Sequence, residues 1–300
     1  MRIYRDWEPA GAPLAVALGS FDGLHRGHQA VIGQVLNCPG QVPAVVTFDE
    51  NPSAVLGGQS VPLLMTNEEK AHELEKMGVE VLYLLPFSHI CHMQPERFFE
   101  RLQKDLQAKT ISCGFNFRFG DKGRGDTKLL TALCAGAQVQ LKVMAAVEDG
   151  AQPVSSTRIR ALVQQGNMRE AGKLLGRPFG FCFPVEHGRQ LGRTLGIPTI
   201  NQALPKDFIR PPFGVYASMV TVDGRRYAGV TNIGVKPTVG SDHVLSETWI
   251  LDYQGDLYGQ SVPVELYDFL RPERRFDSLA AMQDEILKNA ETARQVAGQR

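Results

Sequence analysis

Residues 14–28, LAVALGSFDGLHRGH, decide the fold of the first half of the chain. The apolar run Leu14–Leu18 predicts a short buried strand, and the glycine-rich turn after it leads into a helix expected over His28–Leu36. A strand, a turn and a helix in this order form the repeating unit of a parallel sheet that helices cover.

The same alternation continues to residue 147. Four more strands are expected, over Val42–Phe48, Val79–Phe87, Thr110–Phe115 and Val139–Val147. Three helices separate them: Thr66 opens the first in a capping box with Glu69, Pro95 begins the second, and the third spans Asp126–Ala135. Strands that are apolar on both faces predict a doubly wound parallel sheet, which binds ligands beyond the carboxyl ends of its strands.

The pattern changes after two short helices expected over Ser156–Gln164 and Met168–Leu175. Glycine, proline and β-branched residues crowd residues 178–270, and Asp223-Gly224 predicts a two-residue hairpin turn. We expect Gln254-Gly255-Asp256 to join a further strand pair, Glu247–Leu251 and Val262–Phe269. These features predict a small antiparallel β-barrel. A helix that ends at Gly298 is expected after it, with apolar residues at helical spacing: Leu279, Met282, Ile286, Ala290 and Ala293. Pro178 is the expected boundary, giving domains at residues 1–178 and 179–300.

Composition narrows the function classes. The chain has 300 residues, with 32 basic and 32 acidic side chains, so a protein that holds nucleic acid through a basic surface is not expected. Five scattered cysteines without a CxxC motif indicate reduced thiols in a cytoplasmic protein. No stretch approaches the roughly eighteen apolar residues of a membrane span. The expected partners are small molecules, with neither nucleic acid nor membrane, and self-association stays open.

The turn after the first strand has the features of a phosphate site. Gly19, Ser20 and Phe21 precede a helix start at which His25 and His28 lie three residues apart. Exposed N–H groups and the helix dipole favour phosphate there, and imidazolium donors stabilise charge on the bridging and leaving oxygens when the α-phosphorus of a nucleoside triphosphate is attacked. The plain structural alternative is that the two histidines only cap a helix.

A second helix start follows the fifth strand. Ser155, Ser156, Thr157 and Arg160 bring hydroxyl groups, amides and a guanidinium to the same edge of the expected sheet. A serine N-cap explains one such helix start without any ligand. Two helix starts directed at one crevice predict a phosphate clamp.

The second half contains a glycine-rich run at residues 187–201, HGRQLGRTLGIPTIN. Its spacing and its lack of lysine distinguish it from a Walker A motif. Thr199 and Asn201 lie two apart, so in an extended segment both oxygens face the same way and could serve a hard cation such as Mg²⁺. The structural alternative is an ordinary barrel loop; the functional one is a loop whose amides wrap polyphosphate at Gly188, Gly192 and Gly196.

The first-half motifs resemble a known superfamily. GSFDGLHRGH with SSTRIR is similar to the nucleotidylyltransferases, and residues 114–120, GFNFRFG, resemble bacterial FMN adenylyltransferases. The resemblance implies that Asn116 helps bind the phosphates of ATP and FMN. Glu50-Asn51-Pro52 departs from the family's proline–histidine–proline ending, and loss of that histidine could weaken flavin or nucleotide binding.

The second-half motifs resemble riboflavin kinase in order and spacing, from HGRQLGRTLGIPTIN through TNIGVKPTVG and SETWILDY to LRPERRF. The resemblance implies that Thr199 and Asn201 hold Mg-ATP, that Glu247 is the base for the riboflavin 5′-hydroxyl, and that Arg271 lies near the flavin. From the residues alone, a strand glutamate is more often part of a solvated face.

Together the resemblances imply a bifunctional bacterial riboflavin kinase/FAD synthetase. Its expected substrates and products are ATP, riboflavin, FMN and FAD, with Mg²⁺ as cofactor. Three rivals remain: a kinase with a disabled adenylyltransferase domain, an RNA-linked HxGH enzyme such as a class I tRNA synthetase, and a non-catalytic flavin-binding protein. The zero net charge and the SSTRIR element in place of a lysine-rich loop disfavour the second rival.

Overall fold

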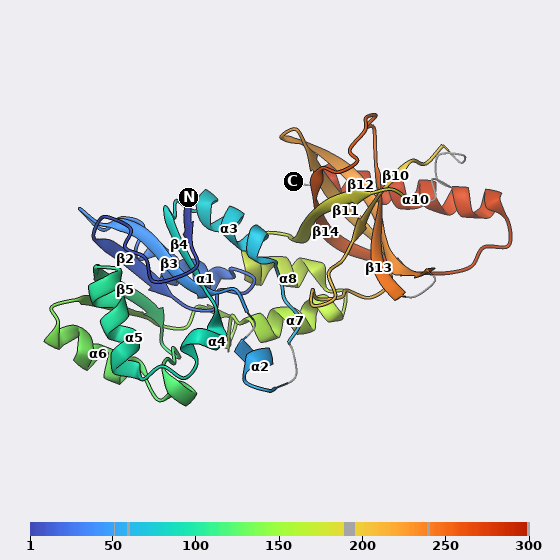
Figure 1. Ribbon diagram of the computed structural model, residues 1–300. Helices are drawn as coiled ribbons and strands as arrows, with labels where there is room; N and C mark the ends of the chain where they lie inside the picture. The colour runs from blue at the N-terminus through green and yellow to red at the C-terminus, as the bar shows by residue number, and fades with distance from the viewer. Residues whose placement is uncertain (51, 59–60, 189–195, 239–240, 299–300) are drawn as a thin grey trace. The chain divides into compact units, whose positions relative to one another are not determined.

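The computed structural model describes residues 1–50, 52–58, 61–188, 196–238 and 241–298. They form two compact units, Met1–Ser156 and Thr157–Arg300. Each unit has its own sheet (Figure 1). None of the helices in the described part of the chain has the length and apolar character needed to cross a membrane.

The first unit contains a parallel sheet, as predicted. Its strand order is β1-β4-β3-β2-β5-β6, with bounds β1 Arg2–Tyr4, β2 Leu14–Leu18, β3 Val42–Phe48, β4 Val81–Leu85, β5 Ala108–Gly114 and β6 Gln140–Met144. The chain winds from β2 through β3 to β4 and then returns to place β5 on the other side of β2. The winding therefore reverses between β2 and β5, and their carboxyl ends mark the expected ligand crevice.

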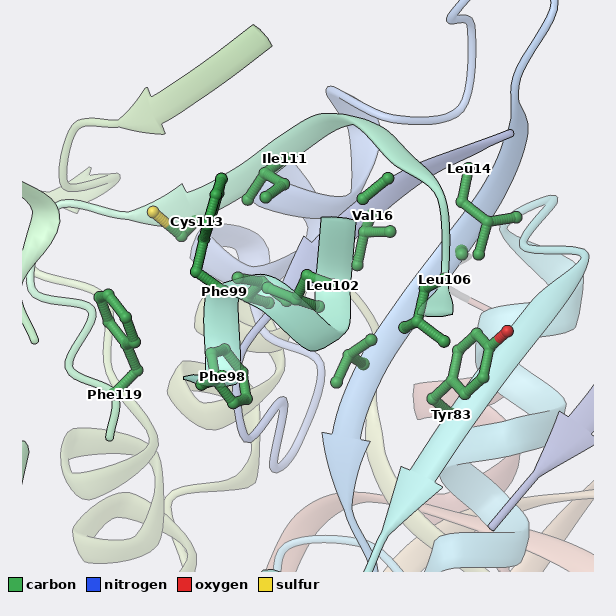
Figure 2. Packing of buried hydrophobic residues seen from close by; sticks show 14 of the residues in the cluster. Leu14, Val16, Tyr83, Phe98, Phe99, Leu102, Leu106, Ile111, Cys113 and Phe119 are labelled. Carbon is green, nitrogen blue, oxygen red and sulfur yellow. The ribbon is translucent and has the colours of Figure 1, made fainter. Parts of the chain in front are cut away.

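Helices cover both faces of this sheet. Along β2, Leu14, Val16 and Leu18 belong to one apolar cluster, and Ala15 and Ala17 belong to another on the opposite face. Figure 2 shows the first cluster, in which Leu14, Val16 and Tyr83 lie with apolar side chains of residues 98–106. The helical segments of this unit are α1 Arg26–Gly33, α2 Pro52–Val55, α3 Asn67–Lys76, α4 Phe87–Ile90, α5 Pro95–Glu100 with a π-helical continuation over Arg101–Asp105, a 3-10 turn at Asp121–Gly123, and α6 Thr127–Gly136.

The helix starts follow the sequence closely. Thr66 caps α3 in the predicted capping box with Glu69, and Pro95 is in the first turn of α5. Helix α1 begins at Arg26, two residues before the expected start, because His25 is its N-cap. The strand expected over Val79–Phe87 is shorter, since Pro86 ends it and Phe87 begins α4. A short hairpin, β7 Glu148–Asp149 and β8 Gln152–Pro153, follows the sheet.

The second unit contains α7 (Ser156–Gln164) from its second residue onward and α8 Met168–Leu175, then forms a closed antiparallel barrel and ends in α10 Leu279–Gly298. The barrel order is β10-β13-β12-β11-β14-β9, with bounds β9 Phe179–Glu186, β10 Thr199–Ala203, β11 Gly214–Val222, β12 Arg225–Thr238, β13 Ser241–Ile250 and β14 Ser261–Pro272. Asp223 and Gly224 form the predicted turn between β11 and β12, both with positive φ, as a type I′ hairpin requires.

One expected strand pair is wrong. The segment 251–260, which contains Gln254-Gly255-Asp256, joins β13 to β14, but β13 pairs with β10 and β12 whereas β14 pairs with β9 and β11. Closing the barrel in this order places the two strands apart, so the segment is a long connection instead of a hairpin loop.

Helix α10 covers part of the outer face of the barrel. Ala290 and Ala293 pack on Val215, Ala217 and Val230. Leu279, expected on the apolar stripe, is instead 66% exposed, because it begins the helix before this contact. All five cysteines are free thiols, four of them buried, as the sequence predicted.

Candidate active sites

A cavity of about 510 Å³ lies at the carboxyl ends of the parallel strands in the first unit. Segments that follow β2, β3, β4, β5 and β6 all contribute to its wall. The cavity brings together eight of the predicted site residues: Gly19, Ser20, Phe21, His25, His28, Asn116, Ser155 and Ser156. Thr157 and Arg160 lie on α7 and are not among the residues that line it.

The two histidines are held by the start of α1. The His28 backbone N–H donates to Nδ1 of His25 at 3.3 Å, and the two imidazole rings stack with centroids 3.6 Å apart. Gly27 permits this arrangement, because a Cβ there would lie 3.1 Å from the His25 ring. Both histidines line the cavity, and His25 is 6% exposed.

The two predicted phosphate elements meet directly. The hydroxyl of Ser156 donates to the backbone carbonyl of Asp22 at 2.8 Å, which joins the start of α7 to the turn after β2. The turn itself is strained, since Phe21 and Leu24 have positive φ values of 50° and 43°. This contact accords with two helix starts that share one crevice.

Apolar side chains form another part of the wall. Phe48 and Phe87 meet edge to face at 4.9 Å, and exposed Leu56 and Phe115 also line the cavity. A flat aromatic ring system fits such a surface.

Beside this wall, Glu50 accepts a hydrogen bond from the Ser88 backbone N–H at 2.7 Å. The bond lowers the pKa of the Glu50 carboxyl below its ordinary value. Glu50, which departs from the family pattern, thus provides the start of α4 with a carboxylate acceptor that its N-cap Pro86 lacks.

In the second unit, the predicted residues share one row across the barrel. Asn201 is paired with Glu247, Glu247 with Asn232, Asn232 with Val215, and Val215 with Arg271. Because side chains alternate along strands, this row faces outward, whereas Gln202, Ser246, Thr248 and Thr231 face the buried interior. Thr199 lies on the same side of β10 as Asn201, as predicted.

Gly188 packs closely on Asn201. A Cβ at position 188 would lie 2.5 Å from Asn201 Nδ2 and 2.9 Å from Oδ1. The first glycine of the predicted phosphate loop is therefore needed for the position of the Asn201 amide. Gly196 has φ 72°, as a loop glycine allows, and Gly192 lies outside the described residues.

Arg271 lies three strands from Glu247 in the row, roughly 14 Å along the barrel at ordinary strand spacing. Its guanidinium lies 3.3 Å from Glu285 of α10 and 5.4 Å from the Phe276 ring. Burial lowers the pKa of Arg271, while Glu285 opposes that change.

A second cavity, of about 330 Å³, lies in the second unit. Thr199 lines it together with Tyr253 and Tyr258 from the β13–β14 connection. The Tyr258 ring stacks on His187 with centroids 3.9 Å apart. This group of rings next to a predicted ATP residue suits a planar base.

The sequence did not single out several of these residues. Asn232 lies within the run TNIGVKPTVG with no pattern that marks it, and Tyr253 and Tyr258 lie on either side of Gln254-Gly255-Asp256. Lys70, on α3, donates to Ser20 in the turn after β2, but nothing in the sequence of an ordinary helix indicates this contact. In each case the contact depends on strand register or helix docking, which residue spacing does not contain.

Comparison with known proteins agrees with both halves. Residues 8–158 match the FAD synthetase family model, and residues 175–297 match the riboflavin kinase family model. The bifunctional riboflavin kinase/FMN adenylyltransferase of Listeria monocytogenes is 34% identical to this chain over 286 residues, which cover 93% of this chain and 91% of that protein. The Bacillus subtilis protein of the same name is 35% identical over 291 residues, which cover 94% of this chain and 92% of that protein. The Escherichia coli K12 protein of the same name is 33% identical, covering 94% of this chain and 92% of its own.

A solved structure also matches nearly the whole chain. A Streptococcus pneumoniae crystal structure, described as a macrolide-efflux protein, superimposes with a TM-score of 0.86 at 30% identity, covering 98% of this chain and 99% of that one.

The fold and the two sites define a two-unit enzyme with a nucleotidylyltransferase-type sheet and a kinase-type barrel. The chain belongs to the bifunctional riboflavin kinase/FMN adenylyltransferase family.

Proposed function

We propose that the cavity of the first unit transfers AMP from ATP to FMN, and that the barrel row of the second unit phosphorylates riboflavin. The two activities of the family, riboflavin kinase and FMN adenylyltransferase, account for both sites. The substrates are ATP, riboflavin and FMN, and the products are FMN and FAD. The observation that carries the assignment is that each unit gathers its own set of predicted residues.

In the first unit, a phosphate oxygen of FMN attacks the α-phosphorus of ATP and pyrophosphate leaves. His25 and His28 donate to the oxygens on which charge accumulates. The amides of the Gly19–Phe21 turn and the hydroxyls of Ser155 and Ser156 bind phosphate oxygens, and Asn116, which also lines the cavity, holds the two substrates together. We extend the clamp to Thr157 and Arg160 by the family resemblance alone.

In the second unit, Glu247 accepts the proton of the riboflavin 5′-hydroxyl as that oxygen attacks the γ-phosphorus of ATP. ADP then leaves, and the phosphate group stays on the new FMN. Asn232, next to Glu247 in the row, is placed to orient the hydroxyl or the carboxylate. Arg271 at the other end is the proposed contact for the flavin ring, and Gly188, Gly192 and Gly196 approach the polyphosphate.

The donor set around Asn201 fits a magnesium ion. Thr199 and Asn201 offer neutral oxygens on one side of β10, and Asn201 lies in register between Glu186 of β9 and Glu247 of β13. Hard oxygen donors with adjacent carboxylates are what Mg²⁺ prefers. When bound there, the ion would neutralise charge on the phosphate oxygens.

Selective inactivation tests the assignment of the two sites. Glu247→Ala should lower FMN formation by about 10²–10⁴-fold, the usual worth of a general base, and leave conversion of FMN to FAD intact. His28→Ala should lower FAD formation by about 10²–10³-fold, the cost of removing one charge-stabilising donor, and leave FMN formation intact. A time course with riboflavin, ATP and Mg²⁺, with both products resolved by chromatography, measures both. Loss of both activities in either variant would contradict the two-site assignment.

Three further expectations, on domain bounds, location and partners, go with this proposal. We propose functional domains at residues 1–178 and 179–300. We place the enzyme in the cytoplasm on the ground of its free, scattered cysteines. Its partners are small-molecule substrates, without nucleic acid or membrane, and self-association is left to direct measurement of the mass in solution.

A further inference from the structure

Lys70 is a buried cation that the proposed chemistry does not use. It lies one turn into α3, is 6% exposed, and its ammonium donates to the backbone carbonyl of Ser20 at 3.2 Å. The hydroxyl of Thr47 donates to the same carbonyl at 2.9 Å. A buried lysine is costly unless it is paired, so its position behind the phosphate turn calls for an explanation.

The entry to α3 supports the floor of the site at two further points. The Leu64 backbone N–H donates to the Asp22 carboxylate at 3.0 Å. The Asn67 side chain donates to the Asp49 carbonyl at 2.9 Å. Residues 64–70 thus hold both the turn after β2 and the segment after β3, and Lys70 contacts Ser20, which lines the cavity.

The bond to Ser20 decides how the turn faces a ligand. The Ser20–Phe21 peptide is trans, so the Ser20 carbonyl and the Phe21 N–H point in opposite directions. The carbonyl is held toward Lys70 and Thr47, so the N–H of the same peptide points away from them, and both Ser20 and Phe21 line the cavity. The positive φ of Phe21 is an unfavourable conformation, which needs such support from its surroundings.

We propose that Lys70 is a positioning residue for adenylyl transfer, holding the Ser20 carbonyl away from the bound phosphates so that the turn presents its N–H groups to them. The inference rests on the proposed function of the first unit. Lys70 itself does not touch the substrates; it acts through the Ser20–Phe21 peptide.

The state of charge of Lys70 gives this role a signature. Burial lowers its pKa from 10.5 to about 8, while Asp22 and Asp49, the charged groups that face it, oppose the shift. The ammonium is therefore mostly present at pH 7 and is lost as the pH rises through about 8. We expect the rate of FAD formation to fall above this pH, which gives its pH profile an alkaline limb. The kinase activity of the same chain does not depend on Lys70 and provides an internal reference without this limb.

The test compares the full-length chain with Lys70→Met, Lys70→Arg and Lys76→Met. Lys70→Met should lower kcat/KM for FAD formation by about 10–100-fold, the loss typical of a misplaced binding group, and abolish the alkaline limb near pH 8. Lys70→Arg keeps a cation that does not deprotonate, so activity should persist and the limb should move upward. Lys76→Met is the matched control, because Lys76 lies exposed on the same helix and pairs with nearby Glu73 at 2.9 Å.

The outcomes separate the two proposals. A chain that forms no FAD from FMN at all would overturn the proposed function and this inference together. Normal FAD formation by Lys70→Met would overturn the inference alone, as would an alkaline limb that stays near pH 8 in either Lys70 variant. If Lys70→Met does not fold, Lys70→Arg and the pH profile of the unsubstituted chain still test the inference. An unsubstituted chain whose FAD formation does not fall near pH 8 would also refute the role of Lys70.

Discussion

A single methyl group at Gly188 should inactivate the kinase. In Gly188→Ala the new Cβ would lie 2.5 Å from Nδ2, 2.8 Å from Cγ and 2.9 Å from Oδ1 of Asn201. Ordinary contact requires about 3.5 Å, so the Asn201 amide must move by roughly 1 Å. Asn201 is 7% exposed, which leaves it little room to yield in place. A displacement of this size at a binding group costs on the order of 10²-fold in rate.

The assay is the riboflavin, ATP and Mg²⁺ time course, with FMN and FAD measured separately. FMN formation should fall about 100-fold, while FAD formation from added FMN should be unchanged. Gly298→Ala is the control, since a methyl group there meets nothing within 4 Å. Kinase activity in Gly188→Ala within twofold of the parent would refute the argument that the close approach of Gly188 places Asn201.

Two further predictions concern stability and the departure from the family pattern. Phe208→Ala should destabilise the barrel by about 3–5 kcal/mol, because Phe208 is 1% exposed and packs on Phe183 at 5.2 Å; thermal unfolding followed by activity should then show kinase loss before adenylyltransferase loss. Glu50→Ala should raise KM for FMN severalfold through loss of the acceptor at Ser88, whereas Glu50→Gln, which keeps an oxygen there, should change it little. Because the hydrogen bond lowers the pKa of Glu50, its carboxylate stays ionised at neutral pH, so the effect should not vary between about pH 6 and pH 8. A KM for FMN that is equal in both Glu50 variants would argue against this role.

Much of the fold follows from short-range rules. Strands β2 and β3 begin and end where the apolar runs do, and the Thr66–Glu69 capping box and the Asp223-Gly224 turn form as predicted. These features depend on burial periodicity, capping and turn conformation, all of which a local stretch of sequence specifies.

The failures have a common physical origin. The expected strand pair around Gln254-Gly255-Asp256 was wrong because strand order in a closed barrel depends on contacts between distant segments. Lys70 and Asn232 were missed as site residues for the same reason. Family resemblance indicated Glu247 and Asn201, but only the register shows that they are neighbours.

The pairing register of the strands also keeps the row that contains Asn201, Glu247 and Asn232 on the outer face of the barrel. A slip of one residue in β12 would turn Asn232 inward and Thr231 outward. The interior opposes such a slip, because buried Thr231 has its hydroxyl 2.7 Å from that of Ser218 and 2.9 Å from that of Thr248. After such a slip the Asn232 amide would replace the Thr231 hydroxyl in the interior, and the hydroxyls of Ser218 and Thr248 would lose their partner. Each unsatisfied buried group would destabilise the fold by about 1–3 kcal/mol. The interior hydroxyls therefore hold β12 and β13 in the one register that places Glu247 between Asn201 and Asn232, although none of them touches a substrate.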